Sequence, residues 1–219
     1  MKKRDLAIMN DLNRFRCMTR DDIIELHFKG LKQPVTCCNT VLKRLRRDGY
    51  IEVSKERHPY IYFPSPAGIK KDSTKIPHFL KIVEFYRQTN MYHCPKTFIV
   101  EPKYGKGYME PDAFMIWKGG PFFVEIQRSV YSEKVMNEKV QRYESYFISN
   151  EWQQEPWQPN NKKVFPAVIM ITDTRYKIES SNVKFIQVNN IKQLIDADQP
   201  LKPMNHEIAC SGLKLLLNN

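Results

Sequence analysis

The sequence predicts an α+β or α/β protein built in two parts, and three observations support this class. Apolar residues recur at helical spacing in three segments before residue 50, and two short apolar runs after them form a hairpin pattern. A polar run at residues 70–77 follows, as expected of a linker between domains. The rest of the chain reads as a helix, three strands, a helix and two strands, an order that favours a sheet flanked by helices.

The first helix is expected at residues 3–16. Its apolar stripe consists of Leu6, Ile8, Met9, Leu12 and Phe15. A second, short helix has Thr19 as its N-cap and stops at Gly30. After Gln33-Pro34, Thr36 is expected to cap a third helix that runs to Arg47 or Asp48 and ends at Gly49.

Two strands are expected at residues 50–53 and 60–63, around a basic hairpin tip at residues 54–59. Three short helices followed by such a hairpin indicate a winged helix-turn-helix domain, which we assign to residues 1–69. The third helix would lie in the major groove of DNA, and the tip would reach phosphates or the minor groove. The candidate DNA-binding residues are Asn39, Thr40, Lys43, Arg44, Arg46, Arg47, Lys55 and Arg57. The alternatives are that the basic helix face is merely solvated, or that the winged helix serves as a protein–protein interaction module.

Charge and composition agree with a folded protein that has an anionic partner. Hydrophobic residues make up 42% of the chain and charged residues 27%, which excludes a disordered polycation or a fibrous sequence. The 35 Lys and Arg against 24 Asp and Glu give a net charge of +11. Of these, 17 basic and 9 acidic residues lie within the first 75 positions, so the excess is concentrated in the predicted DNA-binding domain.

The same sequence indicates a cytoplasmic protein without a membrane partner. It has no run of 18 apolar residues and no signal-peptide core. Its five cysteines are an odd number and include no CxxC pair, so we expect reduced thiols and neither disulfides nor a structural zinc.

The second domain is expected at residues 78–219. Its helices are predicted at residues 78–89 and 132–149, and its strands at 97–100, 112–117, 122–128, 165–172 and 183–188. Residues 118–121 form the turn between the second and third strands. After Asp196 the sequence is uninformative, and Leu213 to Leu217 are expected to pack on this domain or on another subunit of a homodimer.

Two acidic residues mark a candidate metal site in this domain. Asp112 and Glu125 are on strands joined by one turn, and Glu84 from the preceding helix offers a third carboxylate. Hard divalent cations such as Mg²⁺ take oxygen ligands, and such an ion activates water and offsets charge at a scissile phosphate. Solvated carboxylates with no ligand are the alternative.

Three stretches of this domain resemble a known fold. They are Glu110-Pro111-Asp112-Ala113, the run from Phe123 to Arg128, and Lys139 to Tyr143 with Tyr146-Phe147. They are similar to the core of the PD-(D/E)XK, or restriction-endonuclease-like, fold, and most similar to the replication-relaxation family of Gram-positive plasmids and mobile elements. The junction from Tyr62 to Gly68 also resembles that family, whose members join a winged helix to a nuclease-like domain. The resemblance implies a mixed central sheet flanked by helices.

The resemblance also implies roles for individual residues. Asp112 and Glu125 match the two motif acids, and Glu84 matches a helix-borne acid of many nucleases with this fold. The lysine expected two residues after the second acid is replaced by Gln127, and Lys139 or Lys134 is the candidate for a lysine displaced to the helix. The candidate catalytic set is therefore Asp112, Glu125, Gln127 and Lys139.

Three functions remain open from the sequence. The first is a DNA-binding accessory factor for plasmid, phage or integrative-element DNA, acting on double-stranded DNA with replication or relaxation proteins of the same element. The second is an active Mg²⁺-dependent endonuclease. The third is a transcriptional regulator, which explains the basic charge but leaves the paired carboxylates unexplained.

Overall fold

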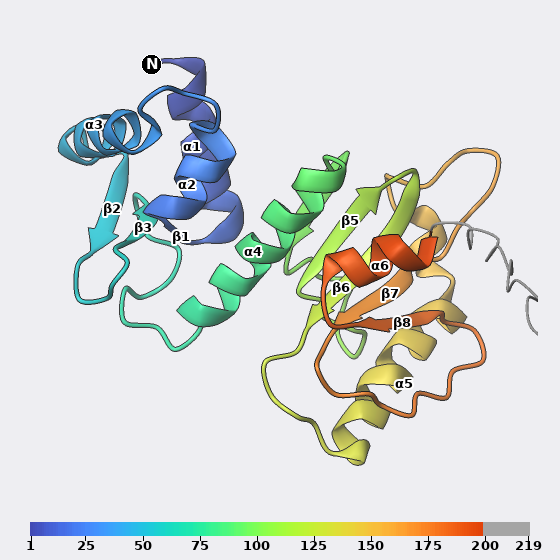
Figure 1. The fold of residues 1–219 in the computed structure, drawn as a ribbon. Helices are drawn as coiled ribbons and strands as arrows, with labels where there is room; N and C mark the ends of the chain where they lie inside the picture. Colours follow the sequence, from blue (N-terminus) through green and yellow to red (C-terminus); the bar gives the residue numbers. More distant parts are fainter. Residues whose placement is uncertain (199–219) are drawn as a thin grey trace, which may run out of the picture.

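The computed structural model describes residues 1–198, in which helices pack on a small sheet and on a larger mixed sheet (Figure 1). The predicted α+β class, with a mixed sheet flanked by helices, is therefore confirmed. The end of the predicted second domain, including Leu213 to Leu217, lies outside the described residues. Within residues 1–198, each helix is too short or too polar to cross a membrane.

The first part of the chain forms three helices and an antiparallel sheet. The helices are α1 (Lys3–Phe15), α2 (Arg20–His27) and α3 (Pro34–Arg47), and the strands are β1 (Met18–Thr19), β2 (Ile51–Ser54) and β3 (Ile61–Pro64). The strand order is β1-β3-β2. The predicted helices and hairpin are all present, whereas β1 was missed because two residues are too few to show an alternating pattern.

One of the two predicted helix caps is confirmed and the other is wrong. Thr19 caps α2: its hydroxyl accepts from the Asp22 N–H at 3.1 Å, and the Asp22 carboxylate accepts from the Thr19 N–H at 2.9 Å. Thr36 does not cap α3, because the helix already starts at Pro34. Proline suits the first turn, where its missing N–H has no helical partner to lose. Gly49, with a φ of 78°, follows the end of α3 as predicted.

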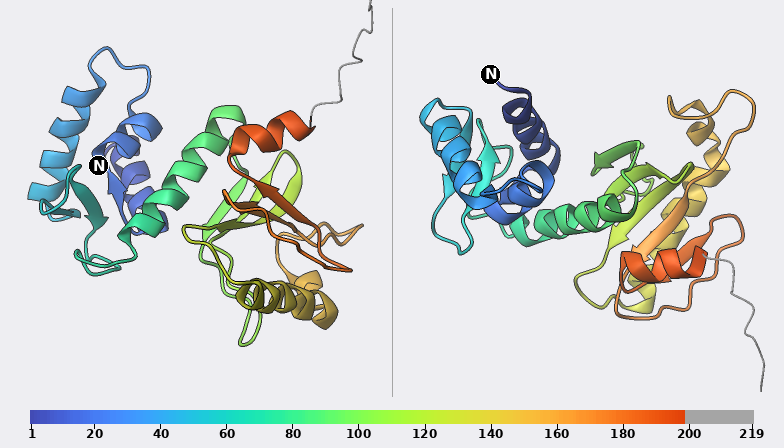
Figure 2. Two further views of the ribbon diagram at one scale, coloured as in Figure 1. Left: turned by 60° about the horizontal axis from the view of Figure 1, so that its bottom comes forward. Right: turned by 45° about the horizontal axis from the view of Figure 1, so that its top comes forward.

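Helix α4 (Ile76–Tyr92) lies between the two sheets and contacts both parts of the chain (Figures 1 and 2). It starts two residues earlier than predicted, since Pro77 is accommodated in its first turn. Its Arg87 forms ion pairs with Asp22, at 2.6 Å, and with Glu25, both on α2. One continuous apolar cluster includes Ile23 of α2, Ile82 of α4 and Val124 of the large sheet.

The large sheet has the order β4-β5-β6-β7-β8. Its strands are β4 (Thr97–Val100), β5 (Ala113–Trp117), β6 (Gly120–Ile126), β7 (Ala167–Ile171) and β8 (Phe185–Val188). Strands β4, β5 and β6 are antiparallel neighbours, and β6, β7 and β8 are parallel neighbours.

Two helical layers cover the large sheet. Helix α5 (Glu133–Ser149) covers one face, and α4 with α6 (Ile191–Asp198) covers the other (Figure 2). The alternation of strand residues produces this division: Ala113 and Met115 belong to the cluster of α4, and Phe114 to the cluster of α5. Helix α6 was not predicted, and neither was the short 3-10 helix Glu151–Gln154 that follows α5.

Candidate functional site

The predicted carboxylates lie at one end of the large sheet, beside a cavity of about 300 Å³. Three acidic residues line this cavity, namely Glu101, Asp112 and Glu125, and so does Lys139. We call these four residues the carboxylate site. Further basic groups on the same wall are Lys75, His78 and Arg128. The site therefore contains both signs of charge.

Strand register explains why the three acids meet. Val100 pairs with Ala113, and Ala113 pairs with Val124. Continuing this register by one residue places Glu101, Asp112 and Glu125 in one row across β4, β5 and β6, and the Glu101 N–H donates to the Asp112 carbonyl at 2.9 Å. Residues in one row point to the same face of a sheet, which here is the face that α5 covers. Glu101 has a φ of 46°, a conformation seen in few non-glycine residues and enriched at functional sites.

Glu125 is the most deeply buried acid of the site, with 2% of its side chain exposed. Its Oε2 forms an ion pair with the Lys139 ammonium, and its Oε1 accepts a hydrogen bond from the Tyr143 hydroxyl at 2.7 Å. Both donors come from α5, one turn apart. The predicted displaced lysine is therefore beside the second acid, whereas Lys134 is exposed on the same helix.

Asp112 directly precedes β5 and has two partners. Its Oδ2 accepts from the Ile126 N–H at 2.6 Å, and its Oδ1 lies 3.3 Å from Nε2 of His78 on α4. The imidazole thus joins the carboxylate site from the opposite helical layer. Burial lowers the pKa of His78, which favours its neutral form.

Burial dominates the protonation of the two acids. It raises the pKa of Asp112 to about 6, although the Ile126 N–H and Lys139 oppose the change. Burial likewise raises the pKa of Glu125 despite the adjacent Lys139 and Tyr143. Burial alone would lower the pKa of Lys139, but the Glu125 carboxylate outweighs it and the pKa is raised, so Lys139 is an ammonium at neutral pH.

Gln127 follows β6 and lines the same cavity. Both polar atoms of its amide are buried, and among the described residues neither has a hydrogen-bond partner. Buried amides are normally satisfied, so this one is available to a ligand or to water in the cavity. It supplies no charge at the position where the family pattern has lysine.

Glu84 was predicted as a third metal ligand, and the structure does not bring it to the site. Its side chain is 44% exposed, pairs with Lys81 at 2.7 Å, and accepts from Gln88 at 3.3 Å. It is six residues after His78 on α4, about 240° around the helix, so only one of the two can face Asp112. Glu101 and His78, which sequence reasoning missed, are there instead. Glu101 had a detectable signal, because it directly follows a predicted strand.

The fit of Mg²⁺ can be judged from the oxygens that are present. Three of the four carboxylate oxygens of Asp112 and Glu125 already accept a hydrogen bond, and the donor at Glu125 Oε2 is itself a cation. The fourth, Asp112 Oδ1, lies 3.3 Å from Nε2 of His78. Among residues 1–198, no three His, Cys, Asp or Glu side chains are grouped so that they could hold a metal ion. The site as folded therefore does not fit Mg²⁺.

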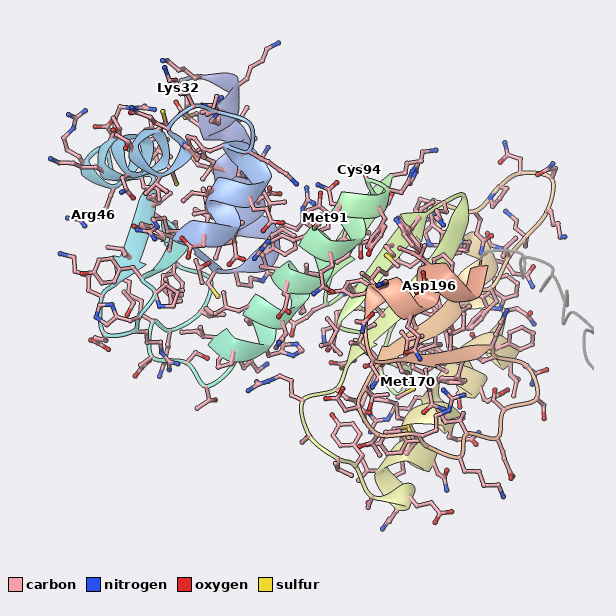
Figure 3. The ribbon with its side chains drawn as sticks, viewed as in Figure 1. Lys32, Arg46, Met91, Cys94, Met170 and Asp196 are labelled. Carbon is pink, nitrogen blue, oxygen red and sulfur yellow. The ribbon has the colours of Figure 1, made fainter. Side chains whose placement is uncertain are left out.

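The predicted DNA-binding residues form a second region, on α3 and the β2–β3 hairpin. Seven of the eight are exposed: Asn39, Thr40, Lys43, Arg46, Arg47, Lys55 and Arg57. Arg46 extends from α3 into solvent (Figure 3). Arg44 is the exception, since it donates to the buried Asp5 of α1 at 2.8 Å. We call the exposed seven the basic face.

Asn39 also borders a cavity of about 430 Å³ between α3 and the hairpin tip. The other residues of this cavity are Arg20, His58, Pro59, Tyr60 and Tyr62. The basic face is therefore continuous with a hollow that contains aromatic and guanidinium groups.

A comparison with protein families gives one match. The family described as replication-relaxation matches residues 9–166, a stretch that includes α3, Asp112, Glu125 and Lys139. Neither the curated proteins nor the solved structures contain a match to the chain.

Proposed function

Because the chain belongs to the replication-relaxation family, we propose that it is a DNA-binding accessory protein in the replication or relaxation of plasmid, phage or integrative-element DNA. Its first part acts as a winged helix that holds double-stranded DNA. Its second part is a PD-(D/E)XK-like domain that holds DNA, or a replication protein of the same element, without cutting.

The observation that carries this proposal is the exposure of the basic face. Lys43, Arg46 and Arg47 extend from one helix with no large apolar group among them, and an α-helix fits the major groove of duplex DNA. Asn39 and Thr40 are small polar groups suited to base edges. Lys55 and Arg57 are exposed at the hairpin tip, a position that suits phosphate contacts beside the groove.

The carboxylate site supports a holding role better than a cutting role. Lys139 already offsets the charge of Glu125, so the two acids do not need a metal ion to balance that charge. One observation favours the alternative of a metal-dependent endonuclease: Asp112, Glu125, Lys139 and the unpartnered Gln127 amide all border one cavity.

DNA binding is tested by fluorescence anisotropy with a labelled duplex. Lys43→Glu with Arg47→Glu is the informative pair, because both side chains are exposed, whereas changing Arg44 would also remove an ion pair to Asp5. We expect at least a ten-fold loss of affinity and a salt slope shallower by about 2, roughly 0.9 for each lost phosphate contact. The matched control is Lys162→Glu with Lys163→Glu, which makes the same charge change in an exposed loop of the second part. An equal loss in both double variants would attribute binding to net charge and reject the winged helix.

Cutting is tested with supercoiled plasmid in the presence of Mg²⁺ or Mn²⁺. We expect the plasmid to remain supercoiled with wild type, Asp112→Ala and Glu125→Ala alike. Cleavage by wild type that both substitutions abolish would establish the endonuclease, and cleavage that survives both would exclude this site as its source. Tight binding to a single operator sequence over bulk DNA would instead favour a transcriptional regulator.

A further inference from the structure

The groups that contact the two carboxylate oxygens of Glu125 determine which cation can bind there. Both of its oxygens have donors, and its side chain is 2% exposed, so neither oxygen is open to bulk water. Lys139 and Tyr143 are four residues apart on α5, which places their side chains on the same helical face. One helix therefore presents an ammonium and a hydroxyl to the two oxygens of a single carboxylate.

The ammonium is held from other sides as well. The ring of Tyr131 lies 5.8 Å from Lys139 Nζ, close enough for a cation–π contact. Only 24% of the Lys139 side chain is exposed. A lysine with these neighbours is confined at the site, unlike Lys134, which is exposed five residues nearer the start of α5.

The ammonium of Lys139 offsets negative charge that a divalent metal would otherwise offset. Asp112 and Glu125 are in one row on adjacent strands, and when both are ionised the ammonium reduces their combined charge from −2 to −1. Two carboxylates buried without a cation are costly, and hard divalent ions bind such oxygens. The unpartnered amide oxygen of Gln127, on the same cavity wall, adds one neutral oxygen to those of the two carboxylates.

We infer that the ammonium of Lys139 is the resident cation of the carboxylate site and takes the place of a divalent metal. The wild-type protein then binds neither Mg²⁺ nor Mn²⁺ there. Removing the ammonium creates a Mn²⁺ site on Asp112, Glu125 and the Gln127 amide oxygen. This inference goes beyond the proposed function and does not depend on DNA binding, because metal binding is measured without DNA.

The inference is tested on the full chain by electron paramagnetic resonance of Mn²⁺. The spectrum shows the free ion, so its intensity falls when the protein binds Mn²⁺. We expect wild type and the control Lys134→Met to leave Mn²⁺ free. Lys139→Met should bind one equivalent of Mn²⁺ at least ten-fold more tightly than any residual binding by wild type, and adding Glu125→Gln to it should abolish the gain. Lys139→Arg keeps the charge and should behave as wild type.

Two results would overturn the inference. One is Mn²⁺ binding by wild type that Glu125→Gln removes, and this result is decisive whether or not the Lys139 variants fold. The other is a Lys139→Met protein that keeps the circular dichroism spectrum of wild type and binds Mn²⁺ no more tightly. Lys139→Gln, whose amide can still donate to Glu125, provides a second neutral variant for the same comparison.

Discussion

At the scale of single residues, Arg44 shows how a predicted DNA contact acquires a structural role. Its guanidinium on α3 donates to Asp5 of α1, which is 1% exposed. Asp5 also accepts from the Lys2 N–H at 3.0 Å. Burial raises the pKa of Asp5, but the hydrogen bond from Arg44, the Lys2 N–H and the charge of Arg44 together leave that pKa below its ordinary value of 3.8. Arg44 thus links α3 to α1 from the edge of the basic face.

We predict that Arg44→Met lowers the free energy of unfolding by about 2 kcal/mol at pH 7, the range of a hydrogen bond to a charged group. The pKa of Asp5 is lower in the folded than in the unfolded protein, so the stabilisation is complete above pH 3.8 and is lost as pH falls through the folded value. Urea denaturation at pH 7 and pH 3 should therefore give a smaller difference from wild type at pH 3. Lys43→Met, at an exposed neighbour, should change stability by less than about 0.5 kcal/mol at either pH. A pH-independent cost would assign the effect to packing of the arginine stem.

The carboxylate site divides into residues that sequence could predict and residues that it could not. Asp112 and Glu125 follow from their spacing on two strands joined by one turn, which is a local property, and Lys139 follows from the resemblance to the nuclease-like fold. Glu101 reaches the site through strand register, and its only sequence signal is that it directly follows a predicted strand. His78 reaches the site through the packing of α4 on the sheet, which no local pattern specifies. Glu84 was a wrong prediction for the same reason, since the face of α4 that meets the sheet is fixed by tertiary packing.

At the scale of elements, short elements and helix ends also depend on tertiary packing that local sequence does not specify. The positions of α1, α2, α3 and α5 follow from apolar period and breakers, and the strand order along the chain follows from branched apolar runs. Helix α6 and strand β1 were not predicted, because each is short and takes its stability from neighbouring elements. The two predicted caps, Thr19 and Thr36, had similar sequence signals but differ in the structure.

We predict that Thr19→Ala lowers the free energy of unfolding by about 1 kcal/mol, because the first turn of α2 loses the acceptor for the Asp22 N–H. Thr36→Ala should change it by less than about 0.5 kcal/mol, since Thr36 is an exposed residue inside the first turn of α3. Chemical denaturation measures the free energy of unfolding of both variants, which carry the same Thr→Ala change. Equal costs would mean that the loss comes from the threonine methyl rather than from the cap.

At the scale of the whole molecule, α4 joins the two parts that the sequence predicted as separate domains. Its apolar residues Phe79, Ile82 and Phe85 belong to a cluster that extends from α1 into the large sheet. Arg87 adds ion pairs to Asp22 and Glu25, and Asp22 is almost fully buried. A helix that contributes to both cores couples their unfolding, because neither part can lose its packing without exposing the surface of α4.

We therefore predict one cooperative unfolding transition for the full chain. All three tryptophans, Trp117, Trp152 and Trp157, lie in the second part, so their fluorescence reports that part alone, while far-UV circular dichroism also reports α1, α2 and α3. The two urea midpoints should coincide in wild type. Arg87→Met should separate them, with circular dichroism changing first, because breaking its pairs leaves Asp22 as a buried charge and costs about 3 kcal/mol. Lys81→Met, on the exposed side of the same helix, should keep the midpoints together. Separate midpoints in wild type would mean that the two parts unfold independently and that α4 does not couple them.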